Sequence, residues 1–153
     1  MRIMVESAST RDADRLYKIE TECFGNEAFT KKQVAQLLLD YNSVSLLAKC
    51  DGRVVGFIIG RLQVEEEVLV GHVLTLDVLP ALRGRGIGRR LLQEIESIFV
   101  QKNASESYLE AREDNVAALR LYERMGYVKI GKLRNYYGDA HGIYLKKVLR
   151  KPK

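Results

Sequence analysis

Apolar positions along the chain recur with two spacings, one typical of helices and one typical of strands. Where apolar residues return every three or four positions, the pattern predicts helices over about residues 10–24, 30–39, 86–102 and 115–125. Where apolar and β-branched residues cluster in shorter runs, it predicts strands over about residues 3–8, 43–50, 53–63, 67–79, 106–112, 127–134 and 142–149. This order favours an α/β fold, with a mixed and largely antiparallel sheet of six to seven strands flanked by about four helices.

Residues at the ends of these segments support the boundaries. Thr30 and either Asp114 or Asn115 carry side-chain oxygens of the kind that cap a helix N-terminus. Asp51-Gly52, between two predicted strands, is a strong signal for a tight hairpin turn. No linker, repeat or low-complexity segment divides residues 1–153, so we expect a single domain.

The composition is that of an ordinary globular domain. Of 153 residues, 46% are hydrophobic and 29% are charged, which argues against disorder and against a coiled coil. Because no apolar signal segment follows Met1-Arg2 and no apolar run approaches the length of a membrane span, we expect a cytoplasmic protein with no membrane partner. Cys23 and Cys50 lack the spacing of a redox or metal motif, and the only histidines are His72 and His141, so we expect no metal site.

The net charge of +5 at pH 7 raises the question of an anionic partner. No RNA- or DNA-binding motif accompanies this charge, so the sequence does not favour a nucleic-acid partner. A cofactor that carries phosphate groups is a sufficient reason for local basic residues, and a contact with the ribosome stays open.

A glycine-rich turn joins the strand predicted at 67–79 to the helix predicted at 86–102, and its sequence is Arg83-Gly84-Arg85-Gly86-Ile87-Gly88. Glycines at a helix start leave backbone N–H groups unobstructed, and the positive end of the helix dipole adds to their attraction for anions. The turn therefore predicts a phosphate or pyrophosphate site. It lacks the Lys-Ser/Thr pair of a P-loop, and its glycines follow Gly-x-Gly-x-Gly rather than the dinucleotide fingerprint Gly-x-Gly-x-x-Gly.

Three segments, in order along the chain, carry a resemblance to a known family. Arg83-x-x-Gly86-x-Gly88 resembles the pyrophosphate loop of the GNAT superfamily of acetyl-coenzyme A-dependent N-acetyltransferases. Residues 109–127, which read Leu-Glu-x-Arg-x-x-Asn-x-x-Ala-x-x-Leu-Tyr-x-x-x-Gly-Tyr, are similar to the protein N-terminal acetyltransferase branch of that superfamily. Asn135-Tyr136-Tyr137-Gly138 resembles the tyrosine hairpin of the same branch, which includes ribosomal-protein alanine acetyltransferases and archaeal N-alpha-acetyltransferases.

The resemblance implies a GNAT fold and an enzyme that transfers an acetyl group from acetyl-coenzyme A to the N-terminal α-amino group of proteins, ribosomal proteins among them. Its partners would be protein or peptide N-termini, and the enzyme itself a monomer or a weak homodimer. Two alternatives stay open. One is a GNAT enzyme that acetylates lysine side chains or a small amine such as a polyamine, and the other is a non-catalytic acyl-coenzyme A sensor.

The resemblance also implies catalytic roles. Glu110 matches the glutamate that serves as general base in the ribosomal-protein acetyltransferases, and His72 matches a histidine that cooperates with the glutamate in the archaeal enzymes. Either group can take a proton from an ammonium directly or through one water, and which of them dominates is open. Tyr122 matches the family's tyrosine that faces the coenzyme sulfur as general acid.

Two sets of binding residues follow from the same resemblance. The residues expected to hold acetyl-coenzyme A are Leu76, Asp77, Val78, Arg83, Gly84, Arg85, Gly86, Ile87, Gly88, Arg89, Asn115 and Tyr122. The residues expected to contact the peptide are Glu27, Phe29, Tyr136 and Tyr137. The segment around Glu27 lacks the Pro of the eukaryotic enzymes, and the chain has no Trp to match the bacterial Pro-Trp, which leaves the preferred first residue of the substrate open.

Overall fold

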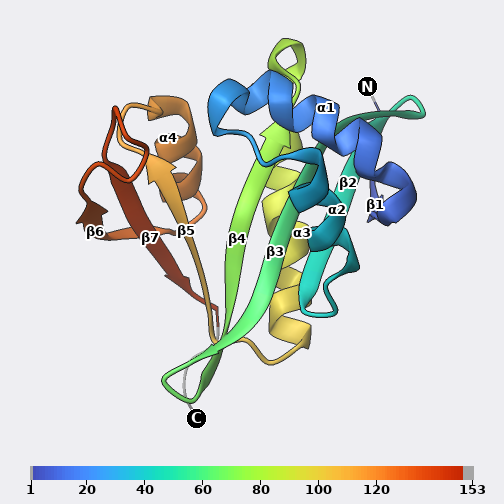
Figure 1. Cartoon of the computed structure of the whole chain (residues 1–153). Helices are drawn as coiled ribbons and strands as arrows, with labels where there is room; N and C mark the ends of the chain where they lie inside the picture. The colour runs from blue at the N-terminus through green and yellow to red at the C-terminus, as the bar shows by residue number, and fades with distance from the viewer. Residues whose placement is uncertain (1, 150–153) are drawn as a thin grey trace.

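Seven strands form one mixed sheet within residues 2–149, the part of the chain that the structure, a computed structural model, describes (Figure 1). The strands are β1 (Ile3–Ser7), β2 (Ser43–Cys50), β3 (Arg53–Glu65), β4 (Val68–Val78), β5 (Glu106–Arg112), β6 (Val128–Leu133) and β7 (Gly142–Val148). The α-helices are α1 (Ala13–Phe24), α2 (Lys31–Leu39), α3 (Ile87–Gln101) and α4 (Val116–Arg124). Single 3-10 turns lie at η1 (Thr10–Asp12), η2 (Gly25–Glu27) and η3 (Pro80–Leu82).

The strand order is β1-β2-β3-β4-β5-β7-β6, and every neighbouring pair is antiparallel except β4–β5. This confirms the predicted α/β class and the predicted mixed, largely antiparallel sheet. No helix within the described residues has the length and apolar character that crossing a bilayer requires.

Side-chain chemistry explains where the helices begin. Thr30 Oγ1 and Asn115 Oδ1 each accept a hydrogen bond at 3.1 Å from the backbone N–H three residues later, so Asn115, rather than Asp114, caps its helix. The helix predicted from residue 10 becomes an α-helix only at Ala13, because η1 is a tighter turn.

Two clusters of buried side chains lie on opposite faces of the sheet. α1 and α2 cover one face of β2–β4 (Figure 1), where the cluster is Leu16, Ile19, Val34, Leu37, Leu47, Phe57 and Ile59. α3 packs on the other face, where the cluster includes Ile58, Leu91, Leu92, Ile95 and Phe99. β3 contributes to both, since Phe57 and Ile59 point to one face and Ile58 to the other.

The parallel pairing between β4 and β5 is short, and the two strands then diverge (Figure 1). β4 pairs with β5 from Val70 to His72, opposite residues 106–108. Just beyond, the register between β3 and β4 shifts, so that Leu74 is an extra residue between the paired Val73 and Thr75. A bulge of this kind bends a strand and increases its twist, which leads the second half of β4 away from β5.

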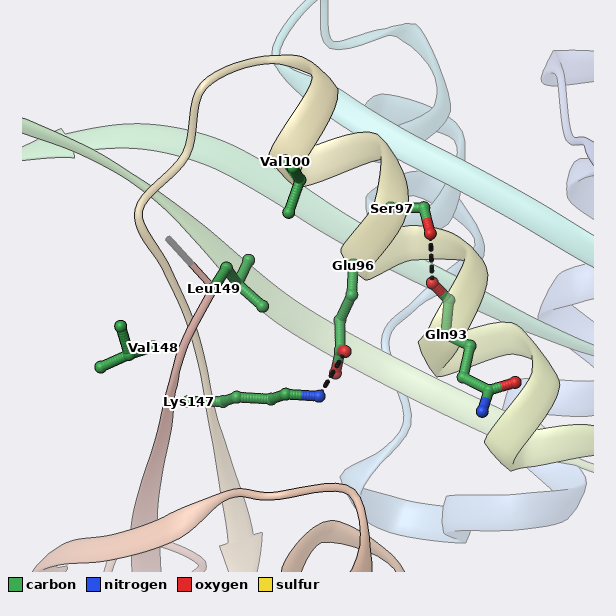
Figure 2. A pocket seen from close by; sticks show the side chains of 7 residues that line it. All are labelled: Gln93, Glu96, Ser97, Val100, Lys147, Val148 and Leu149. Atoms are coloured by element: carbon green, nitrogen blue, oxygen red, sulfur yellow. Dashed lines mark hydrogen bonds and ion pairs between the residues drawn. The ribbon is translucent and has the colours of Figure 1, made fainter. Parts of the chain in front are cut away.

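An ion pair joins α3 to β7 on the far side of the sheet (Figure 2). Lys147 Nζ lies 2.7 Å from one oxygen of Glu96, and the Tyr127 hydroxyl donates to the other oxygen at 2.9 Å. This pair borders a shallow pocket of about 470 Å³ between α3 and β7. The one acid and the one base that line the pocket already bind each other, so this pocket offers no unpaired charged group.

Two carboxyl groups are buried together between α1 and β4. Glu20 is 2% exposed and Asp77 is 1% exposed, and Thr75 Oγ1 lies 2.8 Å from one and 2.6 Å from the other. One hydroxyl has one proton to donate, so the second short contact requires a proton from a carboxyl group. Burial, and then the neighbouring Glu20, raise the pKa of Asp77 well above its usual value. The pair therefore holds a proton in the folded protein.

We expect Asp77→Asn to stabilise the fold at pH 8 by roughly 1–3 kcal/mol, and to stabilise it progressively less at lower pH. Folded Asp77 keeps a proton that the unfolded chain, with an ordinary pKa of 3.8, releases. Wild-type stability therefore falls as the pH rises from about 4 toward the raised pKa of the folded state, whereas Asn has no proton to lose.

Urea unfolding of both proteins at pH 5 and pH 8 measures this difference. Asp51→Asn, in an exposed turn, is the matched control for the loss of one carboxyl group. The same stability difference at the two pH values would contradict the shared proton.

Candidate active site

A cleft of about 960 Å³ opens between the diverging halves of β4 and β5. Its walls come from α1 and η2, from the loop at the start of α3, from β5 and α4, and from the loop between β6 and β7. Most of the predicted site residues line this cleft: Glu27, Phe29, Leu76, Val78, Arg83, Gly84, Gly86, Ile87, Gly88, Arg89, Glu110, Asn115, Tyr122, Tyr136 and Tyr137.

The glycine-rich loop before α3 forms part of the wall. Gly84 and Gly86 have φ angles of +78° and +85°, a conformation that costs glycine little, and a Cβ on either would meet no atom within 4 Å. The Arg90 N–H donates to the Gly86 carbonyl at 3.0 Å, so the N–H groups of residues 87–89 precede the first bond of the helix. The loop thus offers an open cradle of backbone donors at the positive end of a helix, which suits a phosphate group.

Glu110 and His72 meet where the two strands divide. His72 Nε2 lies 2.7 and 2.9 Å from the two carboxylate oxygens of Glu110, and the side chains are 18% and 14% exposed. His72 is opposite Tyr108 in the β4–β5 ladder, and Glu110 follows two residues later on the same face of β5. Glu110 lines the cleft, whereas His72 does not. The cleft therefore contains a carboxylate that can accept a proton and that is hydrogen-bonded to an imidazole outside the cleft wall.

Tyr122 on α4 also lines the cleft. It is 9% exposed, and its ring meets that of Tyr127 edge-on with the centroids 6.0 Å apart. Burial raises the pKa of the Tyr122 phenol to about 12, so the hydroxyl keeps its proton near neutral pH and can donate a hydrogen bond. Asn115 caps the same helix and lines the cleft as well, so its capping and its ligand-facing role are compatible.

The four predicted peptide-binding residues flank the mouth of the cleft from two sides. Tyr136 and Tyr137, in the β6–β7 loop, have ring centroids 4.9 Å apart and nearly perpendicular planes, and burial raises the pKa of both phenols. Glu27 lies in η2, and the Phe29 N–H just after it donates to Glu20 Oε2 at 3.0 Å. This bond fixes the segment after η2 to α1.

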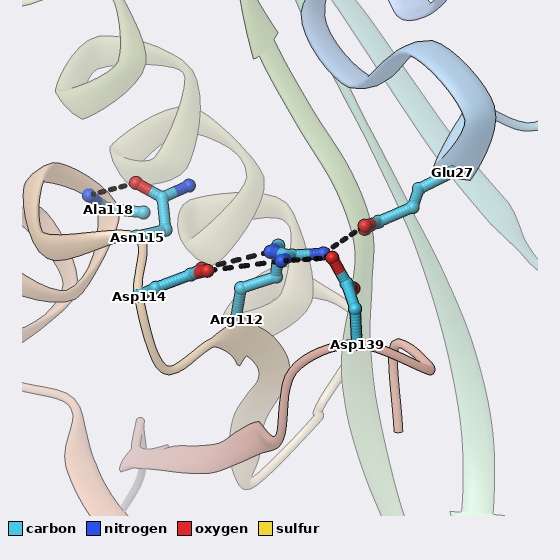
Figure 3. A network of polar contacts seen from close by, with 6 residues as sticks. All are labelled: Glu27, Arg112, Asp114, Asn115, Ala118 and Asp139. Carbon is cyan, nitrogen blue, oxygen red and sulfur yellow. Dashed lines mark hydrogen bonds and ion pairs between the residues drawn. The ribbon is translucent and has the colours of Figure 1, made fainter. Parts of the chain in front are cut away.

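Arg112 connects the loops around this mouth (Figure 3). Its guanidinium pairs with Glu27, with Asp114 at 2.9 Å and with Asp139 at 3.2 Å, and lies 5.6 Å from the centre of the Tyr137 ring. The three carboxylates come from η2, from the loop after β5 and from the β6–β7 loop. This role was not predicted from the sequence, because Glu27 and Asp139 lie 85 and 27 residues from Arg112 and no local spacing relates them to it.

The side chains of three predicted residues do not line the cleft. His72 reaches it through Glu110, Asp77 turns toward α1 and the buried acid pair, and Arg85 sits in the glycine-rich loop. The backbone groups of Asp77 and Arg85 can still face a coenzyme, so the contact of these two residues with it stays a prediction. Within residues 2–149, no cluster of three His, Cys, Asp or Glu side chains has the arrangement of a metal site.

Comparisons with known proteins agree with the geometry of the cleft. The model of the acetyltransferase (GNAT) family matches residues 13–127. The N-alpha-acetyltransferase of Sulfurisphaera tokodaii is 33% identical over 150 residues, which cover 92% of this chain and 89% of that protein. The N-alpha-acetyltransferase RimI of Mycobacterium tuberculosis is 32% identical over 140 residues, which cover 88% of this chain and 84% of that protein.

Solved structures share the fold over nearly the whole chain. The ribosomal-protein-S18-alanine N-acetyltransferase of Escherichia coli superimposes with a TM-score of 0.87 at 22% identity, over 99% of this chain and 97% of the other. A chain of the NatC complex bound to Gag peptide and CoA superimposes with a TM-score of 0.89 at 22% identity, over 98% and 100%. With the family model and the N-alpha-acetyltransferase relatives spanning most of its length, this chain belongs to the GNAT family of acetyl-coenzyme A-dependent acetyltransferases, in the N-alpha-acetyltransferase branch.

Proposed function

We propose that this protein acetylates the N-terminal α-amino group of proteins, with acetyl-coenzyme A as the acetyl donor. The observation that carries the proposal is the contact between Glu110 and His72, which presents a carboxylate in the same cleft as the glycine-rich loop and the tyrosine pair. The Sulfurisphaera tokodaii relative is named an N-alpha-acetyltransferase, and the resemblance to it covers 92% of this chain.

The residues of the cleft fit acetyl-coenzyme A, which supplies a thioester as the acetyl donor. The open positions beside Gly84 and Gly86 leave room for a pyrophosphate group, and the N–H groups of residues 87–89 would donate to it. Arg83 and Arg89 line the cleft beside the loop and add positive charge. The diverging second half of β4, with Leu76 and Val78 in the cleft wall, would follow the pantetheine arm.

Glu110 would act as the general base, either on the amine itself or through one water. The pKa of an α-amino group is near 8 and that of a lysine side chain is near 10.4, so an N-terminus is easier to deprotonate at neutral pH. His72 Nε2 contacts both carboxylate oxygens, which orients the carboxylate toward the cleft and can pass the proton onward.

Tyr122 would donate a hydrogen bond to the departing thiolate. The pKa of its phenol is about 12, well above that of an ordinary thiol near 8.5, so complete proton transfer from Tyr122 to the thiolate would be uphill. Stabilisation of the developing negative charge by a buried donor is the role that this pKa favours.

The side chains around the mouth favour a peptide terminus over a polyamine. Tyr136 and Tyr137 form one side of the mouth, and the carboxylates of Glu27 and Asp139 are held by Arg112 rather than offered to a polyamine. Ribosomal proteins are candidate substrates, since the Escherichia coli structure with the same fold is a ribosomal-protein-S18-alanine N-acetyltransferase.

Mass spectrometry of peptides incubated with the purified protein and acetyl-coenzyme A tests the proposal. The panel pairs peptides with free and with blocked N-termini, each with an internal lysine, and includes polyamines and the N-terminal peptides of ribosomal proteins. We expect acetylation confined to free N-termini. Acetylation of the internal lysine or of a polyamine would instead support the alternative enzyme activity. Binding of the coenzyme without acetylation of any amine would indicate a sensor.

We expect Glu110→Gln to lower kcat by about 10²–10⁴-fold, the usual contribution of a general base, with little change in the KM for acetyl-coenzyme A. Gln keeps the shape of the side chain and a contact to His72, but it cannot accept the proton at neutral pH. Steady-state kinetics with the best peptide of the panel measure both constants. A Glu110→Gln variant with the kcat of the wild type would rule out this base.

Gly86→Glu should abolish coenzyme binding, because a carboxylate would occupy the space beside the loop and repel a pyrophosphate group. Gly52→Glu is the matched control: Gly52 has a φ of +84°, close to the +85° of Gly86, and a Cβ there also meets no atom within 4 Å, but it lies in the β2–β3 turn. Isothermal titration with acetyl-coenzyme A compares the two. Equal affinity for Gly86→Glu and the control would place the coenzyme elsewhere.

A further inference from the structure

An aromatic ring lies flat against the imidazole of His72. The ring of Tyr108 on β5 is parallel to that of His72 on β4, with the centroids 4.1 Å apart and an angle of 12° between the planes. The two residues are direct neighbours in the β4–β5 ladder, at the last paired position before the strands diverge. Tyr108 is 8% exposed, so the stacked pair is largely shielded from water.

The ring of Tyr108 is itself fixed by residues of two other strands, β3 and β7. Its hydroxyl donates to Glu65 Oε1 at 2.9 Å and accepts from Gln63 Nε2, and both partners belong to β3. The ring of Tyr144 on β7 packs against it at a tilt, with the centroids 5.3 Å apart. Burial, and then the hydrogen bond to Glu65, raise the pKa of the Tyr108 phenol, so the hydroxyl stays protonated and acts as a donor.

We propose that Tyr108 is a positioning residue that fixes the ring plane of His72 and, through it, the carboxylate of Glu110. This inference rests on the proposed function of the Glu110–His72 pair. Tyr108 lies outside the sequence motif, which begins at Leu109. It neither lines the cleft nor forms a hydrogen bond with Glu110, so any effect on Glu110 has to pass through His72.

The geometry requires such a support. The terminal torsion of a histidine side chain has broad and shallow minima, so the backbone alone does not determine the ring plane. Both contacts of His72 Nε2 with Glu110, at 2.7 and 2.9 Å, lie in one direction from the ring and are lost when the ring turns. A flat, fixed neighbour at 4.1 Å from the ring blocks that rotation on one side.

Two substitutions at Tyr108 distinguish the role of the ring from the role of its hydroxyl. Tyr108→Phe keeps the ring and removes only the bonds to Gln63 and Glu65, whereas Tyr108→Leu removes the flat surface against His72. We expect Tyr108→Leu to lower kcat by roughly two- to tenfold, the effect that one aromatic pair can supply, with an unchanged KM for acetyl-coenzyme A. We expect Tyr108→Phe to retain most of the wild-type kcat.

A double-mutant cycle with His72→Ala shows whether Tyr108 acts through His72. If it does, Tyr108→Leu has no further effect on kcat once the imidazole is absent. A loss in kcat that is the same with and without His72 would overturn the proposal, because the ring would then act by another route. An equal loss for Tyr108→Phe and Tyr108→Leu would also overturn it, since that result assigns the effect to the hydroxyl and its bonds to β3.

A measurement that needs no substrate keeps this inference separate from the proposed function. The stacked phenol ring shifts the ¹H NMR signals of the His72 ring protons upfield, so we expect those signals to move downfield in Tyr108→Leu and to stay in place in Tyr108→Phe. Unmoved His72 signals in folded Tyr108→Leu would refute the positioning role. If the wild-type protein acetylates no N-terminus, the proposed function fails, and the NMR result still decides whether Tyr108 fixes His72.

Discussion

β4 has one residue more than β3 along their shared ladder, and the extra residue is Leu74. β4 separates from its other neighbour, β5, just before that position, after His72. These two features are physically linked, because a bulge bends its strand and a bent β4 cannot continue beside a straight β5. The unpaired second half of β4 then forms one wall of the cleft and β5 the other. The bulge also interrupts the alternation of side chains along β4, so that His72 and Thr75, three positions apart, lie opposite Arg61 and Ile59 on one face.

The charged groups of the cleft are distributed along its length. Backbone donors and arginines surround the start of α3, where an anion fits, and the carboxylates of Glu27 and Asp139 meet at Arg112, beside the mouth. Arg112 neutralises part of that acidic mouth, so its three partners can lie close together without strong mutual repulsion. One side chain therefore sets both the local charge and the spacing of the loops around the mouth.

The elements of the fold were predictable from the sequence because they depend on local signals. Apolar spacing, the cap at Thr30 and the Asp51-Gly52 turn act within a few residues, and the structure contains all of them. The contact of Glu110 with His72, the stacking on Tyr108, and the pairing of Arg112 with Glu27 and Asp139 join residues 27–85 positions apart or depend on the register of two parallel strands. Motif resemblance supplied candidates for two of these residues, but periodicity carries no information on which long-range pairs meet.

The two ends of the cleft are held by different kinds of interaction, and this difference has a functional consequence. At the end with the glycine-rich loop, Ile87 and Leu91 anchor the start of α3 in the apolar core, so a change there disturbs packing. At the mouth, η2 contributes no buried residue and is connected by polar contacts to Arg112. Ion pairs near the surface contribute little to the free energy of unfolding, so replacing one of their residues costs little stability. A substitution in η2 therefore costs the fold less than one at Ile87 or Leu91, so the mouth tolerates sequence change more readily than the end beside the glycine-rich loop.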